Sequence, residues 1–239
     1  MQIRLTRIHY AWVIIGLSVL LYLGGGSITQ AFGVVILPLQ NEFGWSQGSI
    51  TLAYGISAIM SAVLSPFIGM ATDKYGGRQV LFLGVGSFFI GTSISAMATE
   101  VWHIWIAYGV FLGITQSCLN IVLITTATYW FREKLGVGVG LLQCASGIGP
   151  AGTSLLIGIL LDHYDWRLAF WSLGLGCGSV MTLIVFFFRS RPSDMGLEPF
   201  GGAGTEATRQ RFTREIQMVR DRVRAASIQS TSAFWKLVV

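Results

Sequence analysis

A polar segment at residues 69–78 interrupts two apolar stretches and brings opposite charges close together. It reads Gly69-Met-Ala-Thr-Asp73-Lys74-Tyr-Gly76-Gly77-Arg78. Gly76 and Gly77 permit the positive φ angles of a sharp reversal. Asp73 can accept hydrogen bonds, or pair with Arg78 or with Arg132 from a later polar break. The spacing therefore predicts a tight turn whose ionic groups connect helix ends, while the plainer interpretation is that Asp73 only ends the preceding helix.

Uncharged polar side chains inside the apolar stretches form the second set that could bind a ligand. Such residues are costly in lipid unless they face a cavity or bond a neighbouring helix. Gln116 and Asn120 are four residues apart, so they share one helix face, which we expect to line a cavity. Interhelical hydrogen bonding stays open as the alternative for each of them. The cavity candidates are Tyr22, Ser27, Gln30, Gln116, Asn120 and Gln143.

Residue types that carry out covalent chemistry lack the spacing that an active site needs. His103 and His163 fall at the ends of apolar stretches and are expected to face water. The chain has no paired intramembrane aspartates, no metal-ligand spacing and no serine-centred nucleophile motif. We therefore expect no enzyme activity, no cofactor and no metal.

Six apolar stretches must position these residues. Only 11% of the 239 residues are charged and 53% are hydrophobic, and each stretch approaches the ~20 residues that a helix needs to cross a bilayer. Backbone groups in lipid must be bonded within their own segment, which predicts helices. Bends are expected at Gly24–Gly26 and at Gly149 with Pro150. The stretches are Tyr10 to Leu39, Ile50 to Thr72, Val80 to Ala98, Trp102 to Trp130, Val137 to Leu161 and Leu168 to Phe188.

The basic residues predict the orientation of these helices. Fifteen of the sixteen Lys and Arg residues fall on one side of the predicted membrane, and Arg167 stands alone on the other. The positive-inside rule then places both termini in the cytoplasm. The membrane itself is expected to be the plasma (inner) membrane. No charged residue falls at hydrocarbon depth in any stretch.

An internal repeat relates the two halves of the apolar region. The pattern S-x-x-I-G-x-x-x-D-x-Y-x-x-R occurs at residues 65–78 and again at 154–167. Three helices separate equivalent points, so the copies should lie at opposite faces of the membrane. The predicted fold is all-α: a polytopic bundle of six transmembrane helices built as a 3+3 inverted repeat. Close helix packing is expected at Gly109 with Gly113 and at Gly136 with Gly140.

Three regions follow from these patterns. Residues 1–188 form the transmembrane bundle, and residues 189–230 form a cytoplasmic linker with a basic amphipathic helix at 206–226, suited to anionic membrane lipid. Residues 231–239 resemble the start of a truncated seventh helix. The linker has little aromatic content, which disfavours nucleic acid as a partner.

The segment at residues 69–78 resembles the loop motif of the major facilitator superfamily, G-x-x-x-D-[RK]-x-G-x-[RK]-[RK], at the place where that family has it. Gly77 and Gln79 depart from the motif. Segments 9–12, 43–46, 165–167 and 191–199 resemble the branch of monocarboxylate porters and oxalate/formate exchangers. The resemblance implies the N-terminal six-helix half of a transporter, with a gating loop that comprises Gly69, Asp73, Lys74, Gly76, Arg78 and Arg132.

Two readings of function follow from this resemblance. The first is alternating-access transport of a small solute, as an antiporter or symporter, with a small mono- or dicarboxylate favoured over neutral or drug-like solutes. Because the apolar stretches hold no charge, a counter-cation for a carboxylate must come from a missing C-terminal half or second bundle. The second reading is a non-transporting or truncated half-molecule, because a lone six-helix bundle should not alternate access. Tyr108, where many relatives carry arginine, weakens any specific expectation of proton coupling.

Overall fold

The structure of the protein is a computed structural model that describes residues 10–26, 32–192, 200 and 217–218. Helices dominate the described part of the chain, where the only β-type pairing is an isolated bridge between Phe131 and Phe200. The elements are α1 (Tyr10–Leu21), η1 (Tyr22–Gly26), α3 (Gly33–Phe43), α4 (Gln47–Tyr75), α5 (Gly77–Ala96), α6 (Val101–Ile104), η2 (Trp105–Leu112), α7 (Gly113–Trp130), α8 (Leu135–His163) and α9 (Trp166–Phe187).

Five helical segments are long and apolar enough to cross a membrane. They are α4, α5, the continuous run α6–η2–α7, α8 and α9. The first predicted stretch is instead described as two helices, α1 with η1 and then α3, on either side of residues outside the described part. The chain therefore contains the six expected apolar regions, and the first is not one regular α-helix.

The glycine triplet 24–26 forms part of the π-helical turn η1, at the place where a bend was predicted. The reason lies in packing as well as in weak helix propensity. A Cβ atom at Gly25 would lie 2.5 Å from Met181 Cε and 2.9 Å from Leu119 Cδ1. A side chain at Gly25 would therefore force the ends of the Met181 and Leu119 side chains to shift.

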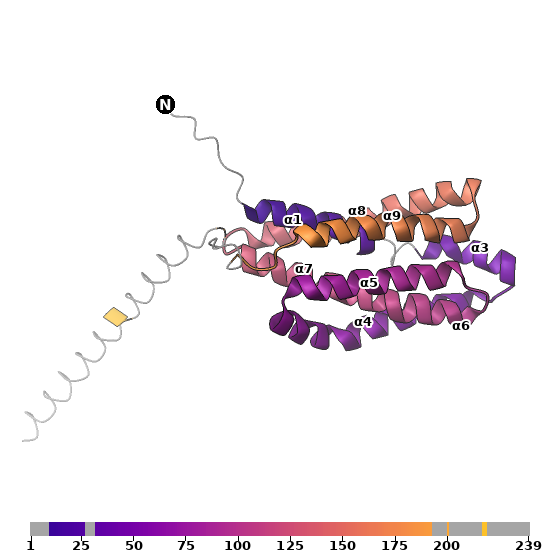
Figure 1. Cartoon of the computed structure of the whole chain (residues 1–239), viewed down its shortest axis with the longest axis horizontal. Coiled ribbons are helices and arrows are strands. Elements are labelled where there is room, and N and C mark those ends of the chain that lie inside the picture. Colours follow the sequence, from indigo (N-terminus) through magenta and orange to yellow (C-terminus); the bar gives the residue numbers. More distant parts are fainter. Residues whose placement is uncertain (1–9, 27–31, 193–199, 201–216, 219–239) are drawn as a thin grey trace, which may run out of the picture.

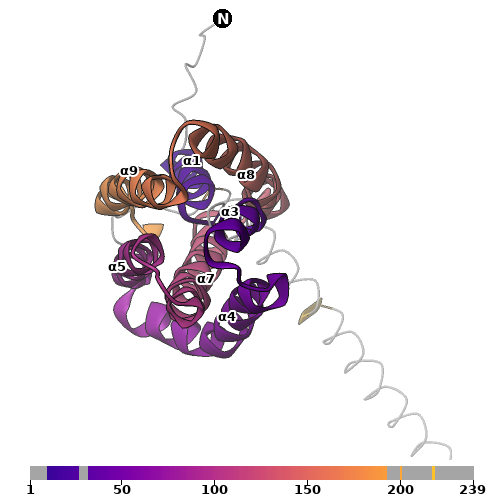
Figure 2. The same ribbon diagram turned by 90° about the vertical axis from the view of Figure 1, so that its right-hand side faces the viewer.

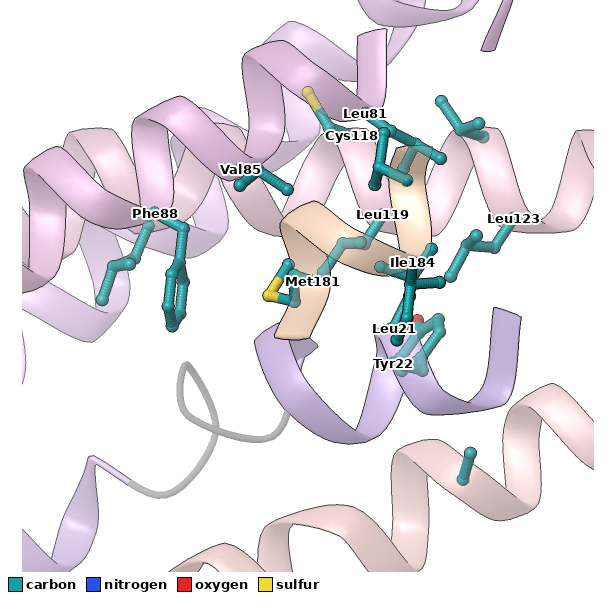
Figure 3. Packing of buried hydrophobic residues seen from close by; sticks show 14 of the residues in the cluster. Leu21, Tyr22, Leu81, Val85, Phe88, Cys118, Leu119, Leu123, Met181 and Ile184 are labelled. Carbon is teal, nitrogen blue, oxygen red and sulfur yellow. The ribbon is translucent and has the colours of Figure 1, made fainter. Parts of the chain in front are cut away.

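The helices run side by side as an elongated bundle (Figure 1). Seen along its length, α5 and α9 lie together on one side, α4 and α8 lie on the other, and α7 packs against both α4 and α5 (Figure 2). Large apolar side chains from different helices meet in the middle. Figure 3 shows Tyr22, Val85, Leu119 and Met181 converging there from η1, α5, α7 and α9.

One end of the bundle, which we call the basic end, gathers the turn after α4, the 131–134 turn and the exit of α9. There the indole N–H of Trp130 donates to the Arg189 carbonyl (3.1 Å), and Arg191 Nη2 donates to the Asp73 carbonyl (3.2 Å). At the opposite end Arg167 donates to Glu42 Oε1 (2.7 Å). The two copies of the sequence repeat thus end at opposite ends of the bundle, as an inverted repeat requires.

The predicted linker and seventh helix fall almost entirely outside the described residues. Within the range predicted as an amphipathic helix, Gln217 and Met218 are helical and exposed. Phe200 pairs with the 131–134 turn, because its N–H donates to the Trp130 carbonyl (2.8 Å) and its carbonyl accepts from the Arg132 N–H (3.0 Å). Phe200 of the predicted linker therefore packs against the basic end.

Candidate functional site

A polar groove of about 440 Å³ opens between α4 and α7. Its floor and walls carry hydroxyl, amide and phenol groups, and its lining contains no charged residue. Gln116 and Asn120 both line it, so the predicted shared face of α7 does face a cavity. The lining residues are Tyr54, Ser57, Ala58, Ser61, Ala62, Ser65, Gln116 and Asn120.

Three serines of α4 supply much of the groove's polarity, and none of them was predicted to line a cavity. Ser57, Ser61 and Ser65 recur every four residues, which places them on one helix face. Their i, i+4 spacing inside an apolar helix was the signal that could have identified them. The hydroxyl of Ser65 donates to the Ser61 carbonyl (2.7 Å) and lies 3.4 Å from the Ser117 hydroxyl of α7. Their hydroxyls provide hydrogen-bonding groups along one wall of the groove.

Asn120 makes an interhelical hydrogen bond and also lines the groove, so substrate contact at this residue stays a prediction. Its side-chain carbonyl accepts a hydrogen bond from the buried Tyr22 hydroxyl of η1, and its residue also lines the groove. Tyr22 therefore acts on the groove indirectly, because its hydrogen bond fixes the orientation of the Asn120 side-chain amide. Tyr108 is fully buried against Phe32, with ring centroids 4.0 Å apart, and is not part of the groove lining.

Among the remaining cavity candidates, the described residue Gln143 does not join this groove. Ser27 and Gln30 lie outside the described residues, and Gln143 is exposed on α8. Helix α8 continues through Gly149 and Pro150 without a break. Thr153 Oγ1 donates to the Gly149 carbonyl (3.0 Å) in the turn that contains the proline. A bend at this pair stays a prediction.

The turn after α4 has the predicted tightness, but only one of its two glycines has the predicted conformation. Gly76 has φ of +87°, in the region that favours glycine, whereas Gly77 begins α5 with an ordinary φ. Gly77 is required for a different reason. A Cβ there would lie 2.7 Å from Val122 Cγ1 and 2.8 Å from Ser190 Oγ. The sequence interpretation of Gly77 as a second reversal residue was wrong.

Of the two kinds of contact predicted for Asp73, the hydrogen bond is present and the ion pair is not. Among the described residues the only ion pair joins Glu42 to Arg167, so Asp73 pairs with neither Arg78 nor Arg132. The Asp73 carboxylate instead accepts from the Tyr129 hydroxyl (3.3 Å). The loop is therefore connected to α7 by a phenol, and to the exit of α9 through Arg191.

The other members of the predicted gating loop lie around the same end of the bundle. Lys74 is exposed, with its ammonium 5.0 Å from the centroid of the Tyr75 ring. Gly69 has open space beside it, and Arg132 is exposed on the 131–134 turn. At the opposite end, His163 is exposed and His103 Nδ1 accepts from the Glu100 N–H (3.1 Å), which is a capping contact.

Comparison with known families decides what this bundle is. The family model described as Major Facilitator Superfamily matches residues 14–238. The chain belongs to this superfamily. Its helices, the turn at Gly76 and the groove between α4 and α7 are therefore features of a major facilitator bundle.

Two curated relatives and one solved structure illustrate this kinship. The chain is 26% identical to the oxalate:formate antiporter of Oxalobacter formigenes over 181 residues, which is 74% of this chain and 42% of that protein. It is 25% identical over 158 residues to human monocarboxylate transporter 14, with 66% and 31% of the two chains covered. The proton:xylose symporter XylE has the same fold, with a TM-score of 0.60 and 16% identity over 74% of this chain and 44% of that one.

The chain spans about half, or less, of the length of the curated relatives that it matches. The resemblance predicted from the loop motif, including the likeness to monocarboxylate and oxalate/formate transporters, is confirmed. The major facilitator bundle described above makes the protein an integral membrane protein.

Proposed function

We propose that this chain forms one six-helix half of a secondary transporter that moves a small organic anion, a mono- or dicarboxylate, by alternating access. The observation that carries the proposal is the polar groove on α4 and α7, in a bundle whose relatives include an oxalate:formate antiporter and monocarboxylate transporters. Hydroxyl and amide donors are the groups that an uncharged half can offer to a carboxylate. The alternative proposal, transport of a neutral solute, differs only in that no cationic side chain is needed to neutralise the substrate.

A second six-helix bundle completes this proposal, whether it is a C-terminal half or another chain. In the most apolar 18-residue stretch of α4 and of α8, only 17% of residues are buried, against 56% in that of α5 and of α6–α7. Gly136 and Gly140, which were expected to pack closely, have open space beside them on α8. They can accept close helix packing from outside the described bundle. The second bundle would supply the cationic side chain that neutralises the substrate carboxylate. It would also supply the surface against which the first bundle rocks during alternating access.

In this proposal the basic end faces the cytoplasm, following the positive-inside rule. The Asp73 turn then acts as the cytoplasmic gating loop. The membrane would be the plasma (inner) membrane, and no catalysis accompanies transport.

Counterflow in proteoliposomes tests the transport reaction. We expect vesicles that contain the protein, expressed from its whole natural reading frame, to accumulate labelled oxalate or formate when they are preloaded with the unlabelled anion. A labelled neutral sugar should not accumulate. Losing a hydrogen bond to a charged substrate costs about 1.5–3 kcal/mol, so Asn120→Ala should raise KM by about tenfold or more. Ser61→Ala, at another residue of the groove lining, should raise KM less.

Thr182→Ala provides the matched control. Its hydroxyl donates to the Gly178 carbonyl within α9 (2.7 Å) and is not part of the groove lining, so KM should be unchanged. Equal KM values for Asn120→Ala and Thr182→Ala would reject the groove as the substrate site. Counterflow of the sugar with no counterflow of either anion would favour the neutral-solute alternative.

A further inference from the structure

A second pocket, of about 320 Å³, lies at the basic end, away from the polar groove. It is enclosed by the end of α4, the first turn of α5 and the exit of α9. Four cationic side chains and one carboxylate line it. Its polar lining residues are Asp73, Lys74, Arg78, Gln79, Arg189, Ser190 and Arg191.

The four cations of this pocket face a single carboxylate, that of Asp73, and none of them forms an ion pair within the described residues. The single ion pair in the described part of the chain is at the opposite end, where Glu42 pairs with Arg167. Arg78 and Arg167 are equivalent in the sequence repeat, yet only Arg167 has a carboxylate partner. Arg191 donates to the backbone carbonyl of Asp73, not to its carboxylate. The pocket therefore presents cationic groups that an anion could neutralise.

Two buried polar atoms in the lining have no hydrogen-bond partner among the described residues. They are the hydroxyl of Ser190, which is 6% exposed, and Nε of Arg78. Buried polar atoms in native proteins are nearly always bonded, and leaving one unbonded costs about 1–3 kcal/mol. Helix α5 also begins here with no side-chain cap, and Arg78 and Gln79 of its first turn line the pocket. An anion at this place would be favoured by all three features.

The surroundings of Arg78 indicate the source of that anion. Its guanidinium lies 5.8 Å from the centroid of the Phe82 ring and 5.4 Å from that of Phe186. Both rings are exposed on the outer faces of α5 and α9, where Leu83 and Phe187 are exposed as well. In a bilayer this places an apolar face directly beside a cationic pocket, which is the arrangement found where hydrocarbon meets headgroups.

We infer that this pocket binds the phosphate of an anionic phospholipid. The headgroup phosphate would accept hydrogen bonds from Ser190 and Arg78 and lie among Lys74, Arg189 and Arg191. The acyl chains would run along the exposed rings of Phe82 and Phe186. Bound there, the lipid connects the α4–α5 turn to the exit of α9, so it stabilises the basic end without contacting the polar groove.

Native mass spectrometry of the purified full chain tests this site. We expect phosphatidylglycerol adducts to survive collisional activation that removes phosphatidylcholine. The double variant Arg78→Gln with Ser190→Ala should lower phosphatidylglycerol affinity by about tenfold or more, because it removes two hydrogen bonds to a charged phosphate. Lys134→Gln removes an exposed cation outside the pocket lining and should change that affinity by less than about twofold.

Other outcomes would overturn the inference. Equal retention of the two lipids, or equal losses in the double variant and in Lys134→Gln, would exclude a specific anionic headgroup site. If inorganic phosphate at low millimolar concentration displaces phosphatidylglycerol from the wild type but not from the double variant, the pocket binds a soluble anion. Thermal unfolding in detergent verifies that the variants are folded. If the double variant is not folded, the same lipid comparison is repeated with Ser190→Ala alone, which removes only one hydroxyl.

Discussion

At the residue scale, the polar groove depends on side chains that bond a neighbouring helix and also line the cavity. Asn120 accepts from Tyr22 and still lines the groove. Because Tyr22 belongs to η1 and Asn120 to α7, the orientation of this amide is coupled to the position of the first span. A small movement of η1 would therefore change the hydrogen bonding that the groove offers to a solute.

Asp73 is the residue for which the gating hypothesis is most directly testable. If its negative charge holds the turn in one access state, Asp73→Asn should lower the transport rate by about tenfold, the scale of a lost hydrogen bond to a charged group, while expression is retained. Initial rates of counterflow measure the effect. Tyr129→Phe removes only the 3.3 Å hydrogen bond and should lower the rate by about twofold, because a long exposed bond is weak. An unchanged rate in Asp73→Asn would leave Asp73 as a helix terminator.

At the element scale, what the sequence predicted well depended on local patterns. The spans of α4, α5, α8 and α9 follow from apolar length alone, and the reversal at Gly76 follows from glycine chemistry. Helix propensity and lipid solvation act on each segment by itself. A pattern along the chain is then enough to predict the element.

The errors concerned contacts between elements. Gly77 is a packing residue because Ser190 and Val122 approach it, and neither is near in sequence. The Asp73 carboxylate accepts from Tyr129 of α7, and Arg191 at the exit of α9 donates to the Asp73 backbone carbonyl instead. Such choices depend on how helices assemble, which a single sequence does not specify. The serine face of α4 is a different case from these errors. The spacing of its serines is visible in the sequence, but the cavity beside them is not.

The close packing of α4 on α7 gives a prediction at the same scale. A Cβ at Gly113 would lie 3.1 Å from both Met60 Cβ and the Ser57 carbonyl oxygen. Gly113→Leu should therefore separate the helices that form the groove and lower the free energy of unfolding by about 1–3 kcal/mol, the cost of overpacking. Thermal unfolding in detergent measures this loss. Gly86→Leu, on α5 with open space beside it, is the control and should unfold near the wild-type temperature.

At the scale of the whole molecule, the bundle has two kinds of surface. The basic end gathers the Asp73 turn, the 131–134 turn, the exit of α9 and Phe200 through hydrogen bonds. The two most exposed spans, α4 and α8, carry large apolar side chains and glycines with open space beside them. The polar groove opens beside α4, so a bundle that packed against this side would also close the groove.

The last prediction tests whether that surface receives a second bundle. Gly140 on α8 and Gly176 on α9 both have open space beside them, so a large side chain disturbs neither helix within the described bundle. If a second bundle packs on α8, Gly140→Trp should abolish counterflow because the helices can no longer approach closely, whereas Gly176→Trp, facing lipid, should retain it. Membrane insertion and detergent-solubilised mass should be measured for both variants. Equal transport by the two variants would mean that α8 faces lipid, and the proposed half-transporter assembly would have to use another face.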